Sequence, residues 1–420
     1  SSNLTAAAST GSGGIFVSET GAMALTSVAA GSGDVELNAA SSITLDGNAT
    51  TPGDLTLSVS DAGGSFTLGS TNTGVSGNNV SIAADNMILN SGGTGISATA
   101  DLTVETSSAS RDIVLGAETA GSLSLTNAEL DELTAATLIV GNKGDGGAII
   151  VSSALDLNNS TKFLSAATGA GSAGLDADVS ACGHDFTIDT LGGVTSASET
   201  VIDTSGSGAG EGGGAISVTA ASDVNIEAIN VSGADDGVNP GGAGGTVDIS
   251  TAAGGGAISV SSIDTSGGDG GSTSGASAGG AVTFEAGGAS NGITVLDAIS
   301  TSGGAGGEGS IGGSGGNVTI STDDGNIYVT DINTSGGDGF GGSSGAAGNA
   351  DFVTVDAGNT GSGNITLKGV ITVLGGSDAS GGGSNGAINL FAEDAVIDGN
   401  SSGPDILAGD LRITAFTGVG

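Results

Sequence analysis

A five-residue phrase, Ile-x-Thr/Val-Ser-Gly, recurs through the second half of this 420-residue chain. It begins at Ile202, Ile229, Ile263, Ile299 and Ile332, and its copies are nearly evenly spaced from the second one on. A nearly fixed period means that each unit is one structural module stacked on its neighbours. The phrase therefore predicts an elongated solenoid whose function lies in its length and its surface.

Two short runs of alternating apolar and polar residues recur at constant phase in these repeats. The runs of one series begin at Ile216, Val247, Val282, Val318, Val353 and Ile388, and those of the other at Ile258, Ile293, Ile327 and Ile365. Such alternation is typical of strands with one buried face. Two strands at constant phase in every repeat predict an all-β fold, a parallel β-helix with apolar side chains inside and Ser, Thr, Asp and Asn outside.

The spacing of the strand-like runs divides the chain into three regions. Residues 1–200 are predicted to form short coils, with a small helical excursion near 127–136, because comparable runs follow one another closely at Val35, Leu55, Val80, Leu102 and Leu123. Residues 201–390 have longer repeats of about 35 residues, a period typical of solenoids. Glycine-rich loops supply the added length, and we expect them to stack into a lateral flange. Residues 391–420 are predicted to form a terminal coil that continues the solenoid.

The composition excludes several classes of protein. Glycine accounts for 85 of the 420 residues and charged residues for 12%, against about 25% in a typical globular domain. Disorder is the alternative for a chain rich in Gly and Ser, but the alternating Val, Ile and Leu runs indicate ordered strands. Five basic residues face 45 acidic ones, a net charge of −40, which excludes nucleic acid as a partner. The sequence contains no run of 18 apolar residues, so no membrane span is expected.

One segment resembles a known family. Residues 123–141, LSLTNAELDELTAATLIVG, followed by 147–155, GAIIVSSAL, are similar to a stretch common in very large filamentous-haemagglutinin-like exoproteins. Glu132 stands where that stretch usually has Arg, and Ala136 where it usually has Gly. The resemblance implies a right-handed parallel β-helix that is secreted, often by a two-partner route, to an extracellular or cell-surface location. It also implies a role in adhesion or surface-fibre building, with cell-surface glycans or matrix as partners.

Acidic residues in the glycine-rich turns are candidate calcium ligands. They are Asp235, Asp236, Asp269 and Asp338. Carboxylates and backbone carbonyls in such turns supply the oxygen ligands that a hard cation prefers. The alternative is that these acids are solvated and hold only diffuse counterions. No other cofactor is expected.

Catalytic groups are poorly represented in the sequence. The lone His184 lies two residues from the lone Cys182, whereas the members of a nucleophilic pair normally come from separate segments. Acid pairs such as Asp323 and Asp324 have the residue types needed to hydrolyse glycans, but they too lie in Gly-rich turns. We therefore expect a protein that is not an enzyme.

The repeated phrase should place equivalent residues on top of one another. Its second position aligns Asp203, Asn230, Asp264, Ser300 and Asn333, and its third aligns Thr204, Val231, Thr265, Thr301 and Thr334. Neighbouring rungs of a β-helix lie about 4.8 Å apart. We expect Asn and Thr ladders that form hydrogen bonds along the stack.

The leading functional hypothesis is a structural subunit or segment of an extracellular bacterial filament, surface layer or adhesin. Its main partner would be itself, through head-to-tail stacking of open β-helix ends and lateral contacts. The alternative is that these ends continue covalently into more β-helix in a longer chain. The rival hypothesis is a polysaccharide-acting β-helix enzyme, a lyase or a glycoside hydrolase. A cleft with converging carboxylates and aromatic residues would favour the enzyme.

Overall fold

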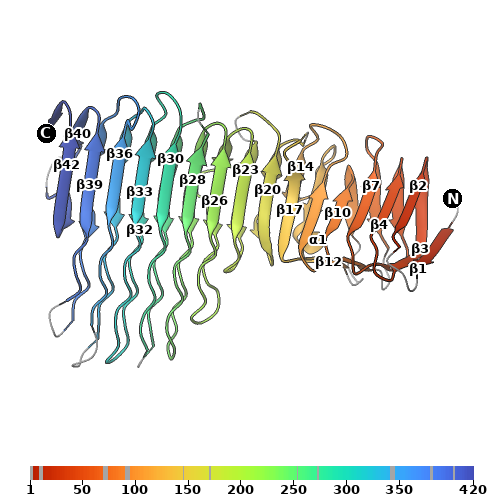
Figure 1. The fold of residues 1–420 in the computed structure, drawn as a ribbon, viewed down its shortest axis with the longest axis horizontal. Helices are drawn as coiled ribbons and strands as arrows, with labels where there is room; N and C mark the ends of the chain where they lie inside the picture. Colours follow the sequence, from red (N-terminus) through yellow and green to blue (C-terminus); the bar gives the residue numbers. More distant parts are fainter. Residues whose placement is uncertain are drawn as a thin grey trace. The chain divides into compact units, whose positions relative to one another are not determined.

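The computed structural model describes residues 3–8, 13–69, 74–89, 95–144, 146–169, 172–252, 254–271, 274–340, 346–378, 382–400 and 403–420. The chain forms two compact units. Unit 1 comprises Ser1–Val179 and Ile188–Gly192, and unit 2 comprises Ser180–Thr187 and Gly193–Gly420. Stacked parallel strands build both units, so the predicted fold, an all-β parallel β-helix, is confirmed (Figure 1).

Three sheets, A, B and C, line the coils of unit 1. The strands of sheet A are β1 (Asn3–Ala8), β3 (Ala22–Ala30), β5 (Ser42–Leu45), β6 (Ala49–Thr50), β8 (Ser65–Leu68), β9 (Gly74–Gly77), β11 (Asn86–Leu89), β12 (Gly95–Ala98) and β16 (Leu133–Thr134). Those of sheet B are β2 (Ile15–Glu19), β4 (Val35–Ala39), β7 (Leu55–Val59), β10 (Val80–Ala83), β13 (Asp101–Glu105), β17 (Thr137–Asn142) and β20 (Ser160–Ser165). Those of sheet C are β14 (Ile113–Gly116), β15 (Leu123–Thr126), β18 (Ile149–Val151), β19 (Leu155–Asp156) and β21 (Ala173–Leu175).

Unit 2 contains strands of sheets B and C. Those of sheet B are β26 (Ile216–Ala220), β28 (Val247–Thr251), β30 (Val282–Ala286), β33 (Val318–Thr322), β36 (Val353–Ala357), β39 (Ala387–Ala392) and β42 (Asp410–Ala415). Those of sheet C are β24 (Val194–Ser196), β25 (Val201–Asp203), β27 (Val224–Asn230), β29 (Ile258–Asp264), β31 (Ile293–Val295), β32 (Ala298–Ser300), β34 (Ile327–Val329), β35 (Asp331–Asn333), β37 (Ile365–Leu367), β38 (Ile371–Val373), β40 (Ala395–Asp398), β41 (Ile406–Ala408) and β43 (Gly418–Val419). The boundaries between the units fall within β22 (Val179–Ser180), within β23 (Phe186–Thr190) and after Gly192.

Alternating side chains give each strand one buried face. In β30, Val282, Phe284 and Ala286 are buried, whereas Glu285 between them is exposed. Val282 pairs with Val318 of the next coil, as the repeat spacing predicts. Each fully buried Val, Leu, Ile or Phe contributes about 1.5–3 kcal/mol relative to an exposed one. Since a single coil cannot bury this face alone, stacking is what stabilises it.

The one helix in the described part of the chain is α1 (Asn127–Leu130). The backbone N–H of Thr126 donates to Glu129 Oε2 at 3.0 Å, which caps the first turn. Leu130 is buried, and β16 follows at Leu133. The helix therefore covers only the first four residues of the predicted excursion near 127–136. No helix in the described residues is long and apolar enough to cross a membrane.

Coil length differs between the two units. In unit 1, Val35 pairs with Leu55 of the next coil. In unit 2, Val247 pairs with Val282 of the next coil, which is a much longer step along the chain. The extra residues leave the coil after the sheet C strands and return to it before the next sheet B strand (Figure 1).

Candidate functional site

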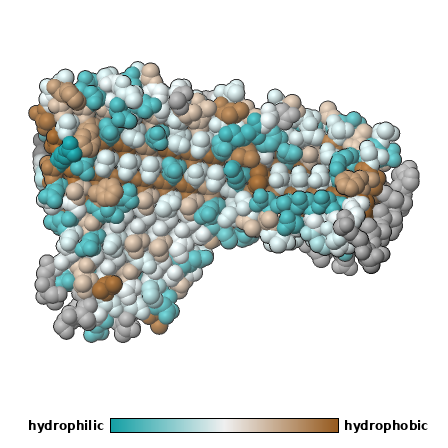
Figure 2. Space-filling view, viewed as in Figure 1, coloured by the Kyte–Doolittle hydropathy of each residue, from teal (hydrophilic) through white to brown (hydrophobic). Residues whose placement is uncertain are grey.

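Six glycine-rich excursions project side by side from unit 2, and together they are called the flange here (Figure 1). They lie within residues 204–214, 231–245, 265–280, 301–316, 334–351 and 373–386. Residues 272–273, 341–345 and 379–381 lie outside the described residues, so the glycine-rich runs that contain them are described only in part. Each excursion has an outgoing segment and a return segment. Figure 2 shows the flange as a surface of mostly neutral hydropathy.

Hydrogen bonds in the flange repeat every three residues. In the outgoing segment, the N–H groups of Gly267 and Gly270 donate to the next coil, at 2.9 Å each. Those of Gly268 and Gly271 donate to the return segment of the preceding coil, at 2.8 and 3.0 Å. The third residue of the triplet, Asp269, is exposed. Three residues per turn is the period of a polyproline II helix.

The return segments show the same period. The N–H of Gly279 donates to Ser314 O of the next return segment at 3.0 Å, and that of Gly280 donates to Thr265 O of its own outgoing segment at 2.7 Å. Ala278, the third residue, is exposed. The flange is therefore two hydrogen-bonded layers of polyproline II-like segments, one outgoing and one returning.

Close backbone approach explains why glycine is so frequent in the flange. A Cβ built on Gly313 would overlap the carbonyl of Ser277, and one built on Gly337 would overlap the carbonyl of Gly304. Both overlaps are with the backbone of the neighbouring coil, which cannot move aside as a flexible side chain can. The sequence carries this signal as the triplets Ser266-Gly267-Gly268 and Asp269-Gly270-Gly271, whose period our sequence analysis missed.

The second position of the repeated phrase directs the chain into the flange. The residues Asp203, Asn230, Asp264, Ser300 and Asn333 stack in register through strands β25, β27, β29, β32 and β35. Four of them accept the N–H of the serine two residues later in an Asx turn, at 2.9 Å for Asp203, 3.2 Å for Asn230, 2.9 Å for Asp264 and 3.1 Å for Asn333. Ser300 bonds along the stack, with its Oγ 2.9 Å from Ser266 Oγ.

The threonines of the phrase correct the expectation that Thr side chains point outward. Thr204, Thr265, Thr301 and Thr334 are fully buried, as is Val231. The hydroxyl of Thr265 donates to Gly280 O at 2.8 Å, and that of Thr301 donates to Gly316 O at 2.6 Å. Each acceptor is the residue at which the return segment re-enters the coil. An inward hydroxyl is tolerated there because this carbonyl satisfies it.

The candidate calcium ligands accept backbone hydrogen bonds instead of gathering around one point. Asp235 Oδ1 accepts the N–H of Asp269 at 2.8 Å, and Asp269 Oδ1 in turn accepts the N–H of Ala305 at 2.6 Å. Asp338 Oδ1 accepts the N–H of Ser377 at 2.7 Å. These bonds join successive coils. Within the described residues, no group of three or more His, Cys, Asp or Glu side chains could hold a metal ion.

Two of these carboxylates have altered acidity. The N–H of Asn239 and then that of Val238 lower the pKa of Asp236, which they bond at 2.9 and 2.8 Å. The backbone N–H and then the hydroxyl of Ser377 lower the pKa of Asp338. Both acids are therefore held in the ionised form by their hydrogen bonds.

The two carboxylates considered for glycan hydrolysis also accept hydrogen bonds from neighbouring coils. Asp323 Oδ2 accepts the N–H of Gly288 at 3.2 Å, and Asp324 Oδ1 accepts the N–H of Ser362 at 3.1 Å. The two carboxylates thus serve different neighbouring coils. Cys182 is half-buried, and its Sγ lies 3.5 Å from Ser180 Oγ.

The last coil of unit 2 exposes residues that face the core elsewhere. Leu411 of β42 is 50% exposed, whereas its register partner Ile388 is fully buried. Val419 of β43 is 64% exposed, against 4% for its partner Val396. β42 is also an edge strand of sheet B. The last coil described therefore carries apolar side chains that are more exposed than their partners in the coil before it.

The first strand of sheet B in unit 1 presents a similar surface. β2 is the other edge strand of sheet B, and its inward residues Ile15 and Val17 are half-buried. Their partners Val35 and Leu37 are buried. Phe16, which points outward, is 68% exposed.

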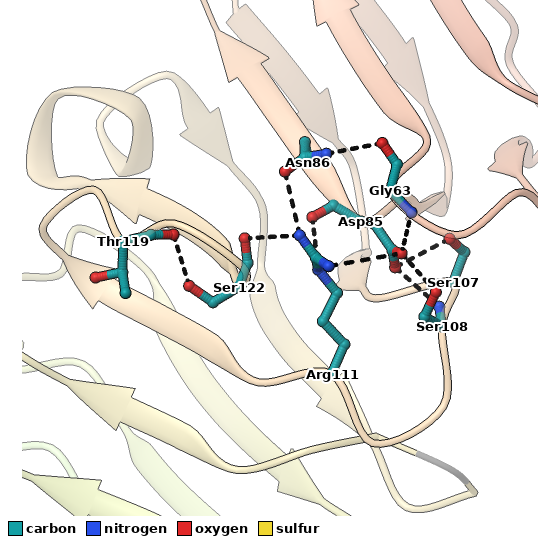
Figure 3. A network of polar contacts seen from close by, with 8 residues as sticks. All are labelled: Gly63, Asp85, Asn86, Ser107, Ser108, Arg111, Thr119 and Ser122. Atoms are coloured by element: carbon teal, nitrogen blue, oxygen red, sulfur yellow. Dashed lines mark hydrogen bonds and ion pairs between the residues drawn. The ribbon is translucent and has the colours of Figure 1, made fainter.

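Unit 1 also contains a buried ionic network, drawn in Figure 3. The fully buried Asp85 accepts the N–H groups of Gly63 and Ser108, at 2.7 and 2.9 Å, and the hydroxyl of Ser107 at 3.2 Å. Arg111 NH1 lies 3.9 Å from Asp85 Oδ2. Burial raises the pKa of Asp85, but the hydrogen bonds from Ser108 and Gly63 and the Arg111 charge outweigh it and leave the pKa below its ordinary value.

A recess of about 560 Å³ adjoins this network. Its walls include Asn86, Ile88, Glu118 and Ser122. Arg111 NH2 donates to Asn86 Oδ1 and to Ser122 O, both at 3.3 Å, so the network holds this wall in place. No aromatic residue lines the recess in the described part of the chain.

Glu118 is the titratable group of the recess. Its pKa is raised by burial, and further by the charge of Glu129 and a hydrogen bond with it. Glu129 Oε2 also accepts the N–H of Thr126. Sequence reasoning did not single out this carboxyl pair, because Glu118 lies in the loop between β14 and β15 and Glu129 lies in α1, and the two meet only in the fold.

No protein-family model, curated protein or solved structure matches this chain. The resemblance to filamentous-haemagglutinin-like exoproteins therefore stays a prediction.

Proposed function

We propose that the protein is a structural subunit or segment of an extracellular filament, surface layer or adhesin, and that its copies associate end to end. The observation that carries this proposal is the stacking of parallel strands in register from coil to coil, an arrangement that another copy can extend. A head-to-tail contact of this kind does not close on itself, so it propagates as a filament.

The composition supports the same proposal. With a net charge of −40, copies repel one another at low salt, and salt screens that repulsion. The flange adds a broad surface of small side chains to unit 2, and lateral contacts between filaments would use it. The extracellular location rests on the resemblance of residues 123–141 and 147–155 to large exoproteins.

Sedimentation velocity and negative-stain electron microscopy of the purified chain test the proposal. We expect polymers that grow with protein concentration and with added salt. Leu411→Glu should place a charge in the end contact and shift the protein to single particles. Asn359→Glu, in an exposed loop of unit 2, is the matched control and should assemble as the parent does. A parent protein that stays monomeric at high concentration and high salt would overturn the proposal.

The recess at Glu118 favours a second candidate function, a polysaccharide-acting enzyme. Glycoside hydrolases use two carboxyl groups, one of them with a raised pKa, and Glu118 has a raised pKa. The test is release of reducing ends or unsaturated sugars from a panel of polysaccharides. Glu118→Gln should abolish any activity found, and absence of turnover across the panel would remove this candidate.

A further inference from the structure

We propose that the flange binds the flange of a second copy, with the return face of one copy against the outgoing face of the next. Each face is the exposed side of one layer of the flange. The return face is formed by the third residues of the return segments, and the outgoing face by the third residues of the outgoing segments. This inference rests on the lateral association in the proposed function and names the two surfaces that make the contact.

Both faces contain rows of residues in register from coil to coil. On the return face, Ala278 O accepts the N–H of Gly244, and Ser314 O accepts that of Gly279. The row as a whole is Ala243, Ala278, Ser314, Asn349 and Ser384, and each of the five is exposed. The equivalent row of the outgoing face is Asp235, Asp269, Ala305, Asp338 and Ser377. Neighbours within a row are one rung apart, which is about 4.8 Å.

Carboxylates cap the outward main-chain donors of the outgoing face. The N–H of Asp269 donates to Asp235 Oδ1, and that of Ala305 donates to Asp269 Oδ1. One further N–H, that of Ser377, donates to Asp338 Oδ1. The second oxygen of each of these three acids accepts no hydrogen bond from the described residues. The outgoing face therefore presents a row of carboxylate oxygens that can accept further hydrogen bonds.

The corresponding donors are uncapped on the return face. The N–H groups of Ala278, Ser314 and Asn349 have no acceptor among the described residues. The residue one rung before each of them is Ala or Ser, which carries no carboxylate. At the end of the row, the N–H of Ser384 donates to Asn349 Oδ1 at 2.9 Å, so the donors of this row point out of the layer. The return face therefore presents a row of main-chain N–H groups that can bind acceptors.

Charge is divided between the two faces in the same way. The return segments contain no charged residue at positions 239–245, 274–280, 309–316, 346–350 and 382–386. Glu211, Asp351 and Asp378 lie beside these segments, and each accepts a main-chain N–H of its own chain, at 2.8, 2.9 and 2.9 Å. A hydrogen bond to an ionised acceptor is roughly twice as strong as one to a neutral acceptor. The uncharged donor row therefore favours carboxylates as its ligands.

The outgoing face of a second copy meets this requirement. Its acids recur at the rung spacing of the donors, because both rows belong to the same kind of coil stack. Two return faces would set donors against donors, and two outgoing faces would set carboxylates against carboxylates, which is destabilising. Contact between unlike faces is therefore favoured, and a contact of this kind can continue to further copies because it does not close on itself.

The area of the face indicates a weak contact between two copies. A return segment such as residues 309–316 has roughly eight residues of about 3.1 Å rise, and the excursions lie about 4.8 Å apart, so the overlap would bury about 600 Å² on each copy. A total of about 1,200 Å² is the lower limit of a specific interface. Single copies should therefore dissociate readily, whereas filaments would be held together by many such contacts at once.

Two substitutions that add the same charge to opposite faces test the pairing. Ser314→Asp puts a carboxylate on the return face, where it would cap the N–H of Asn349 and repel the acids of the partner. It should weaken the contact by about tenfold or more, because like charges then meet. Ala305→Asp, in the same excursion, completes the acidic row of the outgoing face and should leave the contact unchanged or strengthen it. If circular dichroism shows that Ser314→Asp does not fold, Ala243→Asp makes the same change two rungs earlier.

Cross-linking between two single-cysteine proteins provides the readout. In a Cys182→Ser background, Ala278→Cys labels the return face of one protein, and Ser335→Cys labels the outgoing segments of the other. A short flexible bis-maleimide, added at a salt concentration that screens the net charge, should join the mixed proteins at least about tenfold more than either protein alone, since only unlike faces meet. Ser314→Asp is then introduced into the first protein and Ala305→Asp into the second.

The outcomes separate this inference from the proposed function. Cross-linked dimers from the mixture, lost with Ser314→Asp and kept with Ala305→Asp, support the pairing of unlike faces. Dimers from either protein alone, or equal losses with the two Asp substitutions, overturn it. Filaments in the microscope without cross-linking overturn the pairing and leave end-to-end assembly standing. Cross-linked dimers without filaments support the pairing and count against end-to-end assembly, and single particles without cross-linking overturn both.

Discussion

The coils and the flange of unit 2 are built from the same chain by different physics. In the coils, side chains alternate in and out with period two, and residues such as Phe284 fill a dry core. In the flange, hydrogen bonds recur with period three, and glycines such as Gly280 leave no room for a side chain. The coil is held mainly by apolar burial, and the flange by main-chain hydrogen bonds between thin layers.

This difference teaches where each region tolerates change. A coil depends on the volume of its inward side chains, because the surrounding core relaxes only partly around a lost group. A flange segment depends on residues without a side chain, because neighbouring backbone carbonyls occupy the space that a side chain would need. The expected effects of substitution are therefore opposite in kind.

The largest effect is expected in a coil. Phe284→Ala removes a fully buried ring from β30 and should lower the free energy of unfolding of unit 2 by about 3–5 kcal/mol. Urea unfolding followed by far-UV circular dichroism measures it. Phe352→Ala, whose side chain is 43% exposed, is the control and should change the stability by less than about 1 kcal/mol. Equal losses in the two variants would mean that the coil core is not what stabilises unit 2.

A smaller effect is expected in the flange, and it should stay there. Gly313→Ala drives a Cβ into the carbonyl of Ser277 and should break the few hydrogen bonds around it, at about 1 kcal/mol each. Hydrogen exchange should speed up in residues 301–316 and their neighbours in the flange, while β30 and β33 keep their protection. Gly237→Ala is the control, since a Cβ there meets nothing within 4 Å. Global loss of protection would contradict an independent flange.

The period of the coils could be predicted from the sequence because each rung is a strand in which apolar and polar residues alternate locally. The even steps from Val247 to Val282 and on to Val318 are the register that the structure shows. The inward direction of the threonines could not be predicted in the same way. The acceptor for Thr265 is Gly280, 15 residues away, and it reaches the hydroxyl only after the excursion has returned.

The candidate sites also differ in whether a local sequence pattern predicts them. The in-register stack of Asp203, Asn230 and Asp264 followed from the phrase itself. The pairing of Asp85 with Arg111 joins residues 26 positions apart in different coils, and no local pattern signals it. The triplet period of the flange is present in the sequence, but a search for the periods of strands and helices does not detect it.

The neck of the flange, where coil and loop meet, should show a smaller effect than either region. Thr301→Val keeps the shape of the buried side chain and removes its 2.6 Å hydrogen bond to Gly316 O. The expected loss of stability is about 1 kcal/mol, seen in urea unfolding and in faster exchange of the Gly316 amide. The chain offers its own reverse control, since Val231 occupies the same position in an earlier repeat. Val231→Thr should be neutral or slightly stabilising, and a large loss there would show that the neck depends on shape alone.

The smallest effect concerns acidity, and its sign should differ between the two regions. In the flange, hydrogen bonds from Ser377 hold the pKa of Asp338 below 3.8, so its ionised form is favoured in the folded state. The resulting stability is present above the ordinary pKa and is lost as the pH falls through the lowered one. In the coil, burial and then the charge of Glu393 raise the pKa of Asp356 above 3.8. Its ionised form is therefore costly at neutral pH, and protonation removes that cost as the pH falls through the raised pKa.

Removing the charge from each carboxyl should expose this difference in sign. Asp338→Asn should lose stability at pH 7 with the loss fading in acid, whereas Asp356→Asn should gain stability at pH 7 with the gain fading in acid. Urea midpoints measured from pH 7 down to pH 3 for both variants decide the matter. Two curves of the same sign would mean that the carboxylates of flange and coil experience the same environment, contrary to the contrast between a hydrogen-bonded loop and the outer face of a coil.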